Sequence, residues 1–225
     1  MIGKTNSMLI KKEIFTLLPE DYQAVEFIES DGLSYIDTEL KSHSNMSCEL
    51  QFVFTTVPAD GCIVGARHTA QQQGVGKSRL YFYHYYNGHK LGYGMYLGRG
   101  QATQNLLYNI RTRLDVGHQY MYINGELAFE GFDEYEINNE ETFYIFALHD
   151  GDSTTFYSKA RLYYCKIWDG NNLVRQFIPT YRKSDNMIGL YDTINQCFHP
   201  NKGSGTFIKG NDADIKDIIS NITKV

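Results

Sequence analysis

Turn-forming dipeptides recur along this sequence, and each separates two short runs rich in tyrosine, phenylalanine and β-branched residues. The dipeptides are Asn87-Gly88, Asn124-Gly125 and Asp169-Gly170, with a further turn expected at Asn195-Gln196. Asn-Gly and Asp-Gly suit two-residue hairpin loops, whose central residues need positive φ angles. Strands that recur roughly every 8 to 12 residues are typical of antiparallel sandwiches and barrels. The sequence therefore predicts an all-β fold.

The aromatic residues support this prediction. The 225 residues include 18 Tyr and 13 Phe but a single Trp, and Tyr and Phe favour half-buried strands. Within residues 48–54 the larger apolar residues alternate with more polar neighbours, as in a strand with one buried face; they are Cys48, Leu50, Phe52 and Phe54. No amphipathic helix of three turns interrupts the strand pattern, so we do not expect a parallel α/β sheet.

Two short extensions flank the predicted domain. Residues 1–17 form the first and residues 211–225 the second. Isoleucines of the second extension follow the i, i+3, i+4, i+7 spacing of a helix; they are Ile215, Ile218, Ile219 and Ile222. Such a short apolar stripe cannot stabilise an isolated helix in water, so we expect it to dock on its own domain or on a partner. These isoleucines are candidate assembly residues, and deletion of residues 211–225 is expected to abolish assembly but not folding.

Two motifs at opposite ends of the domain carry a family resemblance. The first is LPEDYQAVEFIESDGLSYIDTEL and the second is ARLYYCKIWDGNNLVRQFIPTYRKSDNMIGLYDTINQCFHPNKGSGTF. Together they resemble the laminin-G-like, concanavalin A-like modules of gut bacterial and phage proteins. The resemblance covers roughly residues 18–210 and implies a jelly-roll sandwich of two antiparallel sheets. It also implies that the first and last strands lie near each other.

The compact block FIPTYRKSDNMIGLYD could be a catalytic loop or a strand, a turn and a second strand. We favour the structural interpretation. Pro179 is tolerated in an edge strand, where an N–H group can go unpaired. The polar residues that follow suit a turn, because their side chains hydrogen-bond the local backbone. Gly189 then indicates a bulge or a close backbone approach in the next strand.

Sugar binding requires aromatic faces and a few polar groups, and one strand offers both. Alternate side chains of this strand point to opposite faces, so the outward set is either Tyr81, Tyr83 and Tyr85 or Phe82, His84 and Tyr86. The alternative is that both faces pack against the protein or a neighbouring subunit. The glycan-binding candidates are Tyr81, Tyr83, Tyr85 and His84.

Calcium is the one cofactor considered, because it is common in laminin-G-like relatives and needs several oxygen ligands. Asp150 and Asp152 in HDGDSTT are the preferred candidates, although Asp-Gly-Asp is also an ordinary turn. Asp31 and Asp37 are the second choice. The seven histidines show no HxH or HExxH spacing and are interpreted as non-ligands.

A glycan hydrolase is the enzymatic alternative, because concanavalin-like folds also carry such activity. Hydrolysis needs two carboxylates that face one cleft. The nearest acidic run contains Glu134, Glu136, Glu140 and Glu141 but lacks the central aspartate of laminarinase-like enzymes. We therefore predict no catalytic residue.

The predicted function is non-enzymatic binding or assembly. The lead hypothesis is a phage virion subunit, such as a capsid decoration, head-fibre or tail-associated protein, that contacts other virion proteins or its own copies through the two extensions and recognises surface glycans. The alternative is a bacterial cell-surface carbohydrate-binding module. The N-terminal residues lack signal-peptide features, and the cysteines lack paired spacings, so we expect reduced, mostly buried thiols. A net charge of −5 argues against nucleic acid, and no apolar run is long enough for membrane insertion.

Overall fold

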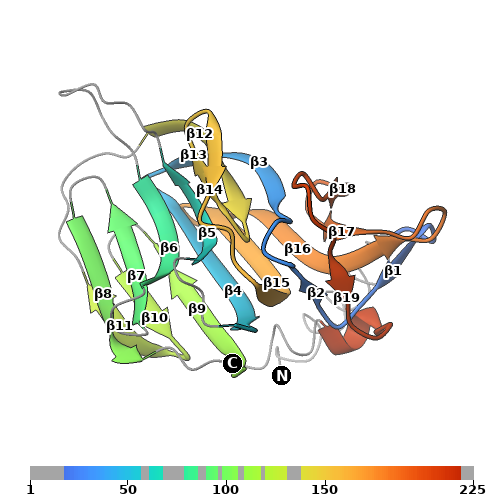
Figure 1. Cartoon of the computed structure of the whole chain (residues 1–225). Helices are drawn as coiled ribbons and strands as arrows, with labels where there is room; N and C mark the ends of the chain where they lie inside the picture. Colours follow the sequence, from blue (N-terminus) through green and yellow to red (C-terminus); the bar gives the residue numbers. More distant parts are fainter. Residues whose placement is uncertain are drawn as a thin grey trace, which may run out of the picture.

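A computed structural model of the chain describes residues 18–56, 61–67, 79–85, 90–95, 98–105, 109–117, 120–130 and 138–218. For the described residues between 79 and 105, and for residues 138 and 139, it describes the backbone alone. Most of these residues form two antiparallel sheets that pack face to face (Figure 1). The fold is therefore a β-sandwich, as the sequence predicts.

The first sheet has eleven strands, and its main order is β11-β10-β9-β4-β15-β16-β17-β18. β1 pairs with β16, and β2 lies between β15 and β19. The strands are β1 (Tyr22–Ala24), β2 (Ile28–Glu29), β4 (Met46–Phe54), β9 (Thr112–Val116), β10 (Tyr120–Ile123), β11 (Glu126–Glu130), β15 (Ala160–Asp169), β16 (Asn172–Arg182), β17 (Met187–Asp192), β18 (Cys197–Pro200) and β19 (Ile208–Lys209).

The second sheet has eight strands in the order β14-β13-β5-β6-β7-β8, and β12 joins β5 to β3. The pairing of β13 with β5 is parallel. The strands are β3 (Ile36–His43), β5 (Gly61–Arg67), β6 (Arg79–Tyr85), β7 (Lys90–Met95), β8 (Gly98–Asn105), β12 (Asn138–Ile145), β13 (Leu148–Asp150) and β14 (Ser153–Thr155).

The core lies between the sheets and is almost entirely apolar. β4 supplies Cys48, Leu50, Phe52 and Phe54, all at most 1% exposed, which confirms the alternation seen in the sequence. β12 and β5 of the second sheet supply residues such as Ile145 to the same cluster. All four cysteines are reduced, and Cys197 is the one that is not fully buried.

The predicted turns form where the structure describes them. Asn124 and Gly125 connect β10 to β11 with φ angles of 52° and 83°, as a tight hairpin of this kind requires. Gly170 connects β15 to β16 with φ 55°. Asn87-Gly88 lies outside the described residues, but β6 and β7 pair antiparallel on either side of it.

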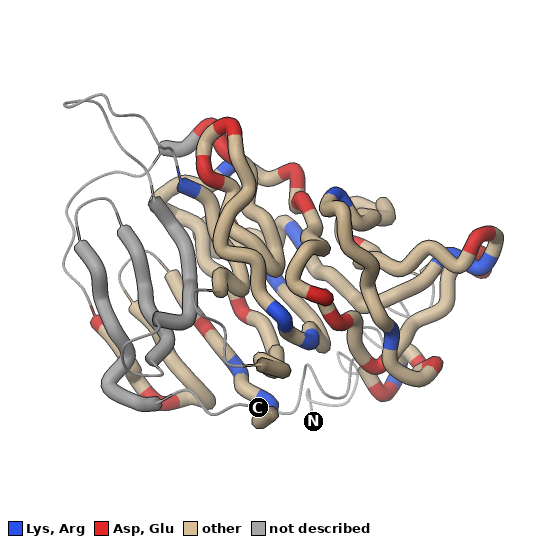
Figure 2. Tube along the Cα trace, in the orientation of Figure 1, with Lys and Arg blue, Asp and Glu red and all other residues tan. Residues whose placement is uncertain are grey.

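The block at residues 177–192 is a strand, a polar turn and a second strand. Charged residues gather at the turn between β16 and β17 (Figure 2). Arg182 and Asp185 pair there at 2.6 Å. Gly189 permits a close approach, because a Cβ there would lie 2.3 Å from the carbonyl oxygen of His199. The edge position predicted for Pro179 is wrong, since β16 has neighbours on both sides. On one side of β16 the neighbouring strand changes from β15 to β1, and Pro179, which has no N–H, lies at this change. The carbonyl oxygen of Pro179 accepts a hydrogen bond from the N–H of Val25.

The two ends of the domain meet, as expected. β2 pairs with β19, and Asp31 accepts a hydrogen bond from the N–H of Thr206 at 2.8 Å. Residues 215–218 form a short helix, the one helix among the described residues, and it cannot span a membrane. Residues 1–17 of the predicted N-terminal extension lie outside the described residues.

Candidate functional site

The C-terminal helix packs on the outer face of the first sheet and borders a pocket there. Ile218 is 6% exposed and lies in a small apolar cluster with Ala24, Tyr164 and Ile178. We call these four residues the outer cluster, because they are separate from the core between the sheets. A cavity of about 400 Å³ opens between the helix, β15 and the segment before β2.

A β-bulge in β15 shapes this pocket. The pairing of β15 with β4 shifts between Leu162 and Tyr164, so Tyr163 is an additional residue in the strand. Leu162 and Cys165 both reach the core, whereas Tyr163 and Tyr164 both line the pocket. Successive side chains of a regular strand would alternate between the two faces. The bulge therefore places two adjacent tyrosines on the pocket side.

One wall of the pocket combines aromatic rings with a cation. The guanidinium carbon of Arg111 lies 3.7 Å from the ring centroid of Tyr163, and Phe27 meets the same ring edge-on at 5.7 Å. Burial lowers the pKa of Arg111, and Tyr163 is among the neighbours that oppose this shift. Arginine nevertheless stays charged, so the pocket contains a fixed positive charge above an aromatic ring.

Four carboxylates also line the pocket, and they are Glu26, Asp212, Asp214 and Asp217. Glu26 Oε2 accepts hydrogen bonds from the backbone N and the side-chain Nδ2 of Asn211, at 3.3 and 3.2 Å. One oxygen of Glu26 is therefore held by the segment that leads into the helix.

The other three carboxylates differ in their partners. Lys209 Nζ donates to Asp212 at 2.8 Å, and this hydrogen bond is the largest of the contributions that hold the Asp212 pKa below its usual value. Asp214 caps the helix, because its Oδ1 accepts from the N–H of Lys216 at 2.9 Å. Asp217 is exposed, and no other described residue hydrogen-bonds its carboxylate. Asp217 is thus available to a ligand.

A second and more open depression adjoins the pocket. It shares Glu26, Phe27 and Asp212 with the pocket and has a volume of about 660 Å³. Lys209 and Asn211 complete this second depression. We call these two adjoining depressions the groove, and the volume of each lies in the range that ligand sites occupy.

The predicted glycan-binding strand is β6, and the structure describes its backbone alone. The pairing register places position 82 opposite the core residue Val64, and positions 81 and 83 opposite Gly65 and Cys62. The side chains of Tyr81, Tyr83, Tyr85 and His84 lie outside what the structure describes, so these residues stay candidates from the sequence.

Aromatic rings also stack on the second sheet. The ring of Tyr144 lies 4.5 Å from Tyr35 and 4.1 Å from His149, nearly parallel to the latter. Both faces of Tyr144 are thus covered by other rings of the same chain. A ligand could therefore contact the edge of the Tyr144 ring, whereas stacking on a sugar needs an open ring face.

The calcium candidates do not meet in one group. Asp150 is 5% exposed, and both of its carboxylate oxygens accept from Arg67, whereas Asp152 is exposed. Asp31 holds its own loop, since its Oδ1 accepts from the N–H of Leu33 at 2.9 Å. Asp37 accepts from the N–H of the residue two positions later. Each of these carboxylates except Asp152 accepts at least one hydrogen bond from the chain itself.

The acidic run proposed for the hydrolase alternative does not assemble a pair in the described region. Glu134 and Glu136 lie outside the described residues. Glu140 is 78% exposed at its side chain and pairs with Lys41, whereas Glu141 is 8% exposed. The latter two carboxylates therefore do not face one cleft.

The candidate assembly stripe is described in part. Ile215 and Ile218 pack on the chain's own outer cluster, so the first of the two alternatives, docking on the same domain, holds for them. Ile219 and Ile222 lie outside the described residues.

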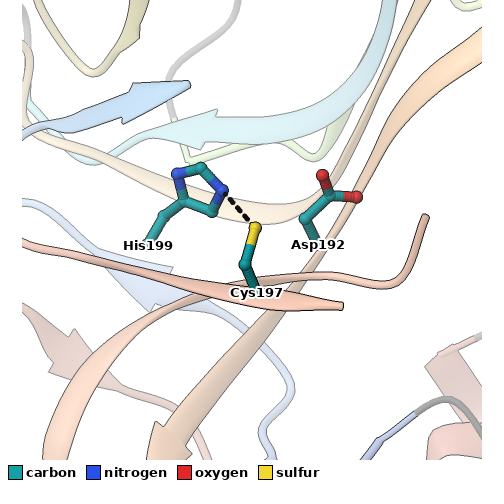
Figure 3. A group of neighbouring side chains, drawn as sticks. All are labelled: Asp192, Cys197 and His199. Carbon is teal, nitrogen blue, oxygen red and sulfur yellow. Dashed lines mark hydrogen bonds between the residues drawn. The ribbon is translucent and has the colours of Figure 1, made fainter. Parts of the chain in front are cut away.

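One group of side chains was missed at the sequence level. Asp192, Cys197 and His199 offer donor atoms that all lie within 4.8 Å of one another, and in Figure 3 the sulfur lies between the imidazole and the carboxylate. A Cys-x-His spacing in a strand could have indicated it, because residues i and i+2 share a face. Asp192 joins them through the pairing of β17 with β18.

The sequence matches no protein-family model and no curated protein. A candidate carbohydrate-binding protein from Bacteroides ovatus, solved by crystallography, superposes with a TM-score of 0.57 over 86% of this chain at 14% identity, and the chain spans 62% of that protein's length. A heptameric SAP-like pentraxin from Limulus polyphemus gives a TM-score of 0.48 at 9% identity, over 85% of this chain and 94% of the pentraxin. The Bacteroides ovatus likeness shows the fold, an antiparallel β-sandwich of the jelly-roll type.

Proposed function

We propose that this chain is a non-enzymatic carbohydrate-binding module whose site is the groove between the C-terminal helix and β15. The observation that carries this proposal is the composition of one pocket, in which Tyr163 and Phe27 lie beside several carboxylates. Arg111 covers one face of Tyr163 and Arg161 one face of Phe27, so the opposite faces and the ring edges are the parts that would contact the C–H groups of a sugar. Carboxylates accept hydrogen bonds from the sugar hydroxyl groups. The fold that the chain shares with a candidate carbohydrate-binding protein supports the same function.

The groove suits more than one sugar unit. The pocket and the adjoining depression have volumes of about 400 and 660 Å³ and share an edge at Glu26, Phe27 and Asp212. A pocket with a single opening would favour a terminal sugar, whereas a groove accommodates a chain. An oligosaccharide is therefore the proposed ligand.

A glycan array followed by calorimetry on the best ligand tests this function. The substitution Tyr163→Ala should weaken sugar binding about tenfold, because contact between an aromatic ring and a sugar contributes roughly 1.4 kcal/mol. Tyr122→Ala is the matched control, since Tyr122 is 37% exposed on the same sheet and does not line the pocket. Equal affinities of the Tyr163 and Tyr122 variants for the same glycan would refute the site.

The same assay separates binding from hydrolysis. The bound oligosaccharide should be recovered intact after prolonged incubation, as mass spectrometry of the supernatant would show. Release of shorter sugars would replace this proposal with the hydrolase alternative.

We also propose that the module is a structural component of a phage particle. The resemblance of the two terminal motifs to phage and gut bacterial modules supports this proposal. Peptide mass spectrometry of gradient-purified particles and of host surface fractions tests it. A fixed copy number in the particle is the expected result. Recovery on the host envelope alone would favour the bacterial surface module.

A further inference from the structure

The hairpin of β17 and β18 places a thiol, an imidazole and a carboxylate together at the end of the first sheet, and none of these three residues lines the groove. Cys197 Sγ and His199 Nε2 are 3.1 Å apart, on the same face of β18. The carboxylate of Asp192 completes the group from the end of β17. Cys197 is half-buried, so the group can be reached from solvent.

The imidazole of His199 is oriented by the second sheet. His199 Nδ1 lies 2.9 Å from the backbone carbonyl oxygen of Asp37 in β3. A carbonyl accepts hydrogen bonds only, so Nδ1 carries the proton and donates it. The unprotonated Nε2 then faces the sulfur. Metal-binding histidines have this arrangement, in which the distal N–H is held by a carbonyl or carboxylate.

The carboxylate of Asp192 is fully buried. Its Oδ1 accepts from the N–H groups of Gln176 and Ile194, at 3.1 and 3.0 Å. Its Oδ2 accepts from Asn195 Nδ2 at 2.6 Å and forms an ion pair with Arg175 Nε at 3.5 Å. A carboxylate has about four acceptor positions, so the fourth, on Oδ2, faces a cation of the chain itself.

Charged groups of both signs surround the sulfur. Asp192 and Glu39 are its anionic neighbours, and Arg175 is cationic and lies 3.5 Å from Asp192 Oδ2. A metal ion between the sulfur and the carboxylate would take the place of Arg175 as the cation beside Asp192.

We propose that Cys197, His199 and Asp192 bind a divalent ion of the zinc class, with water in the remaining position. Sulfur, imidazole nitrogen and carboxylate oxygen together select a borderline ion such as Zn²⁺ over Mg²⁺ or Ca²⁺. In a tetrahedral zinc site these donors are about 3.3 to 3.5 Å apart, from bond lengths of roughly 2.0 to 2.3 Å. The observed separations, from 3.1 Å up to at most 4.8 Å, require small side-chain rotations.

Cobalt(II) titration of the reduced, metal-free chain tests the proposal. One equivalent should produce thiolate-to-cobalt charge-transfer absorption, and Zn²⁺ should displace it. Cys197→Ser should abolish the charge-transfer band and weaken Zn²⁺ binding about tenfold or more. Cys48→Ala is the matched control, because Cys48 is buried in the core. Binding should also strengthen with rising pH, since the thiol must lose its proton.

Thiol protection gives a second readout in the unmodified protein. Zn²⁺ should slow alkylation of Cys197, measured by peptide mass spectrometry, while the three buried cysteines serve as internal references. Unchanged alkylation of Cys197 at millimolar Zn²⁺, or a cobalt spectrum that persists in Cys197→Ser, would overturn the proposal.

Discussion

The core between the sheets and the outer cluster under the C-terminal helix are built in different ways. The core consists of apolar side chains from strands of both sheets. The outer cluster has four buried residues, Ala24, Tyr164, Ile178 and Ile218, which come from distant parts of the chain. Tyr164 is also polar at its tip, where its hydroxyl donates to Glu49 Oε1 at 2.8 Å. We infer that the core determines stability, whereas the outer cluster determines whether the pocket exists.

The largest expected effect is in the core. Ile167 is fully buried on the inner face of β15, and Ile167→Ala should lower the free energy of unfolding by about 4 kcal/mol, because it leaves a cavity between two sheets. Urea denaturation would measure this loss. A loss below about 1 kcal/mol would mean that the sheets close over the cavity. The core would then not be the main source of stability relative to the outer cluster.

A smaller loss is expected for the same substitution in the outer cluster. Ile218→Ala should cost about 1 kcal/mol, because Ile218 packs in a small cluster of four buried residues at the surface of the sandwich, where the protein can close over the lost volume. Ile218→Ala should weaken sugar binding more than Ile167→Ala does, at a temperature where both variants are folded. Equal sugar affinity of the two variants would show that packing of the helix is not needed for the pocket to bind sugar.

Truncation after Gly210 sharpens the same point. The sequence predicts a folded domain that has lost assembly alone. The structure predicts a destabilised domain without a pocket, because residues 211–218 cover Tyr164 and Ile178, and the N–H of Ala213 bonds to Ala24. Thermal unfolding of the truncated chain distinguishes these outcomes.

The smallest expected effect is at the junction of the two chain ends. Burial alone would raise the Asp31 pKa, but hydrogen bonds, first of all from the N–H of Thr206, lower it below its usual value. A carboxyl group whose pKa is lower in the folded state stabilises the fold above its unfolded pKa of about 3.9 and loses this contribution as pH falls below it. Asp31→Asn should therefore destabilise the protein slightly at pH 7 and by less at pH 3. An equal difference at both pH values would contradict this assignment.

Local sequence patterns were sufficient to predict the strands and most turns. The φ angles of Asn124, Gly125 and Gly170 follow from residue type, and the alternation of Cys48 to Phe54 identifies the core face of β4. Pro179 was misplaced because its unpaired position is created by a change of neighbouring strand, from β15 to β1, which local sequence does not encode.

The candidate site was much less predictable. The pocket combines Phe27, Arg111, Tyr163 and Asp217, which are separated by up to 190 residues in the chain. Tyr163 and Tyr164 would lie on opposite faces of a regular strand, and it is the bulge that brings both into the pocket. No short motif reports such a bulge.

The sequence by itself determined the fold class, the hairpins and the helical spacing of the C-terminal isoleucines, because these depend on side-chain periodicity and on the φ preferences of single residues. The tertiary structure decided which face of the first sheet the helix covers and that the Arg111 guanidinium lies over the Tyr163 ring. It also decided that Asp192, Cys197 and His199 lie in one cluster. These depend on strand order and register, where a shift by one residue moves every side chain to the other face.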